Sequence, residues 1–132
     1  MMTPELNALA LLGLLHAALF VAMSVSANRL LPASKTLGTR EAPLEHELTG
    51  KTGRIYRALR NNTENLGFFA AAVVVVQLSG ANSGFTATCA WLTLATRIAY
   101  VPAYVFGWVP WRSLIFTTGF GTTTLMFVAA LL

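Results

Sequence analysis

The chain has 132 residues, of which 55% are hydrophobic and only 11% are charged, and its mean hydropathy is +0.62. Soluble domains carry about 25% charged residues, so this composition excludes an ordinary soluble protein and indicates a single compact membrane domain over residues 1–132. The net charge of +4 is small and the basic residues are clustered, which argues against nucleic acid as a partner.

The first predicted element is an apolar span from about Leu6 to Ala27, which exceeds the roughly 20 residues that a helix needs to cross a bilayer. No Lys or Arg precedes it, so it lacks the basic start of a signal peptide and is expected to be retained. His16 lies alone in this span. Because no partner stands at metal-ligand spacing, we expect His16 to form an interhelical hydrogen bond or to line an oligomer.

Residues 28–53 form the one long predicted loop, which contains two prolines and three glycines. Its acidic residues, Glu41, Glu45 and Glu47, are mixed with basic ones, which is typical of a solvated loop rather than a binding site. His46 is likewise expected to be a solvated loop residue. The loop and the residues just after it also hold a group of basic residues: Arg29, Lys35, Arg40, Lys51 and Arg54.

The second span is unusual because its apolar part, Leu66 to Leu78, is too short to cross a membrane. The turn-forming sequence of residues 79–84 prevents extension in that direction. The helix must therefore extend backward through Glu64 and Arg60, as far as about Arg54, which brings polar residues toward membrane depth.

A third span is predicted from about Phe85 to Tyr104 and a fourth from about Ser113 to Leu132. The third contains Cys89, which we expect to pack between helices since a single cysteine can form no intrachain disulfide. It also contains Pro102, where a kink is expected. The fourth is rich in threonine and glycine over residues 117–124, a composition that favours close helix contacts in an oligomer seam, with a polar vestibule as the alternative.

The distribution of basic residues predicts the orientation. The link between the first two spans and the link that carries Arg112 are basic, whereas the amino terminus and the 79–84 turn contain no Lys or Arg. The positive-inside rule places the basic links in the cytoplasm and both termini outside, and Trp108 and Trp111 fit the cytoplasmic interface. The predicted fold is an all-α, antiparallel four-helix membrane bundle.

A polar stripe marks the start of the second span. Arg57, Arg60, Asn61 and Glu64 are spaced so that they share one face of a helix. Interfacial snorkelling explains the arginines but not the short carboxylate. Arg97, well inside the third span, costs at least about 2.5 kcal/mol there unless it is paired or faces water, and an ion pair with Glu64 is one solution.

One glutamate is too little negative charge for the arginines that converge on this region: Arg57, Arg60, Arg97 and Arg112. The missing anion is expected to come from a ligand with at least two negative groups for the arginines and one positive group for Glu64. Glutathione has this charge pattern. Phospholipid headgroups and nucleotides fit less well but are not excluded by charge alone.

The sequence resembles a known family over nearly its whole length. It is similar to the MAPEG superfamily, the membrane-associated proteins in eicosanoid and glutathione metabolism, in a bacterial-type form. The second-span signature is matched by Arg57, Arg60, Asn61, Glu64 and Phe69. The third-span signature is matched by Arg97 and Tyr104, and an Arg-Ser pair follows as Arg112 and Ser113.

The resemblance implies a homotrimer that binds glutathione between neighbouring subunits near the cytoplasmic face. By similarity, the residues that hold the tripeptide are Arg57, Arg60, Asn61, Glu64, Arg97, Tyr100 and Tyr104. Arg112 and Ser113 would lie beside its sulfur, where a guanidinium and a hydroxyl donor favour the nucleophilic thiolate over a thiol that titrates near about 8.5. No metal is implied.

Three positions depart from the family pattern. Gly67 stands where proline is usual, and Tyr100 replaces a histidine of some members. The link from Tyr104 to Arg112 is one residue shorter than in some enzymes of the family, which bears on the placement of Arg112 and Ser113.

The function that the resemblance implies is a membrane-embedded glutathione transferase, with peroxidase activity as an extension, acting on lipophilic electrophiles that enter from the bilayer lipid. A MAPEG-like protein that binds lipid or a partner protein without chemistry is the alternative, and a lipid-headgroup scaffold is a third option. The lack of a targeting sequence and the external termini are typical of a bacterial inner membrane.

Overall fold

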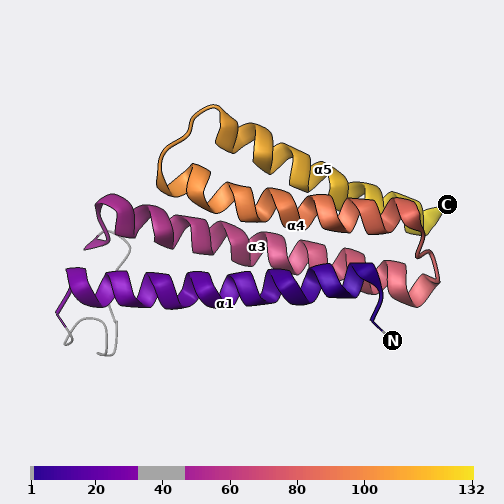
Figure 1. The fold of residues 1–132 in the computed structure, drawn as a ribbon, viewed down its shortest axis with the longest axis horizontal. Coiled ribbons are helices and arrows are strands. Elements are labelled where there is room, and N and C mark those ends of the chain that lie inside the picture. Colours follow the sequence, from indigo (N-terminus) through magenta and orange to yellow (C-terminus); the bar gives the residue numbers. More distant parts are fainter. Residues whose placement is uncertain (1, 33–46) are drawn as a thin grey trace.

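The computed structural model describes residues 2–32 and 47–132. These residues form four helices and no strand, which confirms the predicted all-α class: α1 (Pro4–Leu30), α3 (Gly50–Ser79), α4 (Gly84–Val105) and α5 (Trp111–Leu131). The helices lie side by side with successive helices running in opposite directions (Figure 1). Both termini lie at one end of this antiparallel bundle, and the 106–110 turn lies at the other (Figure 1).

The helices are long enough for the predicted spans. They have 27, 30, 22 and 21 residues, and each therefore exceeds the length of about 20 that a bilayer requires. Among the described residues, α1 and α5 are also apolar enough by composition to cross a membrane. The backward extension predicted for the second span is confirmed, since α3 begins at Gly50, even earlier than Arg54.

The predicted loop 28–53 is too long at both ends. α1 continues to Leu30, where the N–H of Leu31 still donates to the Ala27 carbonyl at 2.8 Å, and α3 begins directly after Thr49. Prolines and glycines indicated the loop, but helices propagate up to such residues once neighbouring helices support them. Lys35, Arg40, Glu41, Glu45 and His46 lie outside the described residues.

Polar side chains define the helix ends near the termini. The hydroxyl of Thr3 accepts from the N–H of Leu6 at 3.3 Å and caps α1. Ser83 and Thr86 form a reciprocal capping box at the start of α4. Gly80 ends α3 with a φ of 71°, a left-handed conformation that favours glycine. The predicted turn at residues 79–84 is thereby confirmed.

The core lies between all four helices in the half of the bundle nearer the termini (Figure 1). It is formed by Ala8, Leu12, Phe69, Ala72, Val73, Val76, Cys89, Ala90, Leu94 and Met126. Cys89 is buried in this cluster, which confirms its predicted packing role. At the same end the buried carboxylate of Glu5 accepts a hydrogen bond from Thr86 and joins α1 to α4.

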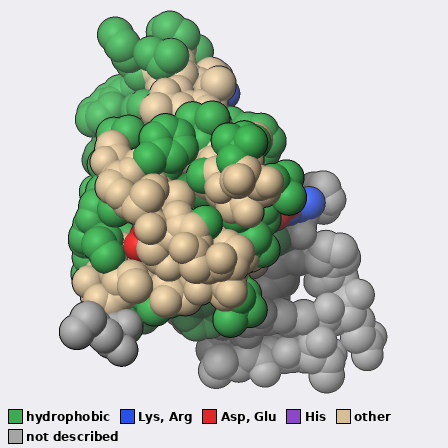
Figure 2. Space-filling model, turned by 90° about the vertical axis from the view of Figure 1, so that its right-hand side faces the viewer, with side chains coloured by type: hydrophobic (Ala, Val, Ile, Leu, Met, Phe, Trp, Pro, Cys, Tyr) green, Lys and Arg blue, Asp and Glu red, His purple; other side chains and the backbone are tan. Residues whose placement is uncertain are grey.

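Large apolar side chains also cover the outside of the bundle. Leu14, Phe20, Leu78 and Ile98 are all more than half exposed. Figure 2 views the end that carries the termini and shows hydrophobic side chains around its periphery with few charged groups among the coloured atoms. Such a surface suits contact with lipid or with further helices rather than with water.

The threonine-rich stretch of α5 packs partly inside the protomer. Thr122 and Thr123 are buried and their hydroxyls lie 2.6 and 3.3 Å from the hydroxyl of Thr93 in α4. The predicted oligomer seam is therefore wrong for these two residues, whereas Thr117 and Thr118 remain exposed. Sequence spacing alone does not distinguish a contact within the protomer from one between protomers.

Gly119 marks the closest approach of α5 to α4. A Cβ atom at Gly119 would lie 2.5 Å from the Thr96 hydroxyl oxygen, whereas one at Gly121 would meet no atom within 4 Å. We expect Gly119→Ala to destabilise the protein by about 1–3 kcal/mol because α5 must shift or Thr96 must change rotamer. Gly121→Ala should be neutral or slightly stabilising. Thermal unfolding in detergent compares them, and equal effects would contradict the close contact.

Candidate functional site

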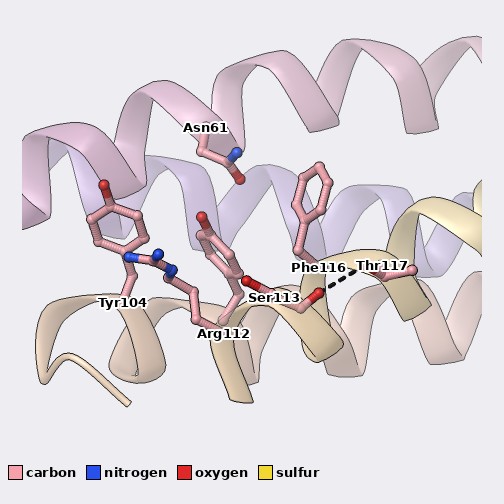
Figure 3. Close-up of a pocket in the computed structure, with 7 residues that line it drawn as sticks. Asn61, Tyr104, Arg112, Ser113, Phe116 and Thr117 are labelled. Carbon is pink, nitrogen blue, oxygen red and sulfur yellow. Dashed lines mark hydrogen bonds between the residues drawn. The ribbon is translucent and has the colours of Figure 1, made fainter. Parts of the chain in front are cut away.

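A pocket of about 310 Å³ opens at the end of the bundle that carries the α4–α5 turn. Residues from three helices line it: Asn61 from α3, Tyr100 and Tyr104 from α4, and Arg112, Ser113, Phe116 and Thr117 from α5. In Figure 3 the labelled side chains face a common space between α3 and α5. Five of these seven residues are predicted site residues, so the structure brings together much of the predicted set.

Contacts between helix ends join the start of α3 to the end of α4. Arg54, near the start of α3, donates from Nη1 to the Val105 carbonyl at the end of α4 at 3.2 Å. Lys51 lies over the ring of Phe106, 5.5 Å from its centroid. Positive groups at a helix C-terminus interact favourably with its exposed carbonyls. These contacts therefore position the turn from which Arg112 follows.

Tyr104 sits between two arginines at the pocket wall. Arg57 in α3 donates from Nε to the Tyr104 hydroxyl oxygen at 3.1 Å. The guanidinium carbon of Arg112 lies 5.0 Å from the centroid of the same ring. A guanidinium over an aromatic face is attracted by the ring's electron density. Tyr104 thus brings positive charge from α3 and from α5 to one side of the pocket.

Ser113 follows Arg112 in the first turn of α5. Its backbone carbonyl accepts from the Thr117 hydroxyl at 2.8 Å, the bond drawn in Figure 3. Its own hydroxyl has no hydrogen-bond partner among the described residues and the side chain is exposed. The Ser113 hydroxyl is therefore available to donate to a ligand.

Arg97 lies behind the pocket rather than in its wall. Its side chain is only 2% exposed, and it donates from Nη2 to Oδ1 of Asn61 at 2.9 Å and from Nε to Oδ1 of Asn62 at 3.3 Å. Its guanidinium carbon lies 4.5 Å from the centroid of the Tyr100 ring. Within the described chain, amide oxygens and an aromatic ring take the place of a carboxylate partner.

The ion pair between Arg97 and Glu64 is therefore wrong. Glu64 is exposed and forms no hydrogen bond or ion pair in the part of the chain that the structure describes. Arg57 and Arg60 are exposed as well. Of the four residues of the predicted stripe, only Asn61 lines the pocket, and Arg57 reaches the pocket edge through its hydrogen bond to Tyr104.

Asn62 is the polar residue that the sequence interpretation missed. It is not one of the stripe residues, yet it is completely buried and contacts both Arg97 and His16. A signal was present, because Asn62 is in helical register with the apolar positions Phe69 and Val76. His16 forms the predicted interhelical hydrogen bond, which confirms that interpretation.

Comparison with known proteins assigns the chain to a family. The MAPEG family model matches residues 6–132, nearly the entire sequence. No curated protein and no solved structure matches the chain. The family match and the two apolar helices together show a membrane protein of all-α fold. The chain belongs to the MAPEG family.

Proposed function

We propose that this protein is a membrane glutathione transferase that conjugates glutathione to lipophilic electrophiles. The observation that carries the proposal is the charge of the pocket: Arg112 is in its wall, Arg57 is bonded to Tyr104 at its edge, and none of its seven lining residues is acidic. A concave site with excess positive charge favours an anionic ligand. Glutathione brings two carboxylates and, when ionised, a thiolate.

The reaction assigns distinct roles to Arg112 and Ser113. A guanidinium and a hydroxyl donor next to the sulfur stabilise the thiolate relative to the thiol, and the thiol proton passes to water. The thiolate then forms a carbon–sulfur bond to the electrophile, and the leaving group departs with its electron pair. With a hydroperoxide as acceptor, two glutathiones would be oxidised to the disulfide while the peroxide is reduced to an alcohol and water.

The exposed charged residues of α3 fit a site completed by a second copy of the chain. Arg57, Arg60 and Glu64 are exposed in the single protomer although they lie beside the pocket-lining Asn61. In the proposed homotrimer these side chains would contact glutathione held between neighbouring subunits. The pocket end would face the cytoplasm and both termini would lie outside, in a bacterial inner membrane.

Conjugation of glutathione to chlorodinitrobenzene by the detergent-purified protein tests the proposal. We expect a rate well above the uncatalysed reaction, with saturation in glutathione. Saturable glutathione binding without conjugation of this or of longer-chain electrophiles would instead support the non-enzymatic alternative. Absence of both binding and turnover would contradict the proposed function.

A further inference from the structure

A chain of hydrogen bonds crosses the bundle from α1 to the pocket. It starts at His16 in α1, passes through Asn62 in α3 to Arg97 in α4, and returns to Asn61 in α3. Asn62 is completely buried and Arg97 almost completely. Its far end, Asn61, is a pocket-lining residue.

The donors and acceptors along this chain can be assigned. Arginine only donates, so the atom of Asn62 that faces Arg97 at 3.3 Å is its oxygen. The amide nitrogen of Asn62 then faces Nδ1 of His16 at 3.2 Å and donates to it. Nδ1 of His16 is thus the acceptor of this hydrogen bond. Each amide side chain in this row of hydrogen bonds therefore has a single orientation that matches donors to acceptors.

The same reasoning determines what Asn61 offers to the pocket. Its oxygen accepts from Nη2 of Arg97 at 2.9 Å and from Nδ2 of Asn65 at 3.2 Å. Both lone pairs of the oxygen are thereby used, and the two N–H donors remain for a ligand. The buried guanidinium behind Asn61 adds positive potential in surroundings that screen it poorly. The wall at Asn61 therefore suits a carboxylate.

We propose that Asn62 is a positioning residue which, supported by His16, holds Arg97 so that Asn61 presents its amide donors to a carboxylate of the ligand. This inference rests on the proposed function and specifies which ligand group meets which atom. Asn62 touches no ligand itself. Its effect is on glutathione affinity, while Arg112 and Ser113 are left to act on the sulfur.

The test replaces Asn62 by leucine, which keeps the volume but removes the acceptor for Arg97. We expect the KM and Kd for glutathione to rise by about tenfold, as for the loss of a hydrogen bond to a charged group, and kcat to stay within about twofold. Asn62→Asp keeps an acceptor for Nε of Arg97 and should restore much of the affinity. Thr63→Ala is the matched control, because Thr63 is exposed and bonds only to its own helix at the Leu59 carbonyl.

A second readout separates this inference from the proposed function. Nitrogen-15 NMR of the detergent-solubilised protein without glutathione should show the side-chain amide signal of Asn61 and the Nε–H signal of Arg97 shifted in Asn62→Leu but not in Thr63→Ala. Unshifted signals, or an unchanged glutathione KM together with a lower thermal stability, would overturn the positioning role. If the wild type bound no glutathione, the proposed function would fail while the NMR comparison still decided the role of Asn62.

Discussion

Arg112→Ala is expected to lower kcat for conjugation by about a hundredfold or more, the size of effect seen when one donor to a developing negative charge is removed. The guanidinium of Arg112 stands in the pocket wall over Tyr104, where it would lie beside the sulfur of bound glutathione. Without it the pKa of the bound thiol returns toward its ordinary value of about 8.5, and little thiolate forms at neutral pH.

Two measurements check this expectation. Steady-state kinetics should show a fall in kcat, and ultraviolet absorbance should show loss of the thiolate signal at neutral pH with partial recovery as the pH is raised. Arg112→Lys should be intermediate, since lysine keeps the charge but not the planar group that stacks on the ring. Thr118→Ala, an exposed position on the same helix, serves as the control. An unchanged kcat in Arg112→Ala would remove Arg112 from the mechanism.

Arg97→Leu is expected to weaken glutathione binding by about 3 kcal/mol, roughly a hundredfold in Kd. The substitution removes the positive charge behind the pocket, leaves the oxygen of Asn62 without its donor, and leaves the oxygen of Asn61 with only the donor from Asn65. The effect should therefore exceed that of Asn62→Leu, in which the charge remains. The stability change should be small, because the substitution leaves one amide oxygen, that of Asn62, unpaired but also removes the cost of burying a cation.

Calorimetric titration and thermal unfolding of the same preparation separate these two effects. Arg97→Lys should recover part of the affinity, since it retains the charge but cannot reproduce two bonds from one planar group. A large loss of stability with unchanged glutathione affinity in the folded fraction would assign Arg97 a purely architectural role. That result would also count against the positioning role proposed for Asn62 and His16.

The fold was largely predictable because its signals are local. The lengths of the apolar runs located all four helices. The run Leu66–Leu78 is too short to span a membrane and is followed by the turn residues 79–84, so the sequence correctly required α3 to extend backward. The ends of the long loop were not predictable to the residue. Whether a helix continues past Arg29 depends on packing against other helices, which composition does not describe.

The candidate site was predictable only in part, since five of the seven residues that line the pocket were predicted as site residues but Phe116 and Thr117 were not. Helical spacing grouped Asn61 with Arg57 and Glu64, yet Asn61 lines the pocket, Arg57 reaches only its edge through Tyr104, and Glu64 is exposed. Asn62, only one residue further on, is buried and supports Arg97. A rotation of about 100° between adjacent residues separates these environments, and which face packs inward is determined by α1 and α4. That information is absent from the α3 sequence taken alone.

The most direct test of the account is a calorimetric titration of glutathione into the detergent-purified wild-type protein, repeated in buffers with different heats of ionisation. We predict saturable binding at or below millimolar glutathione with release of a proton at neutral pH, because the bound thiol ionises. S-methylglutathione, which has the carboxylates but no ionisable thiol, should bind without proton release. Absence of binding at millimolar glutathione would contradict the assignment of this pocket to glutathione.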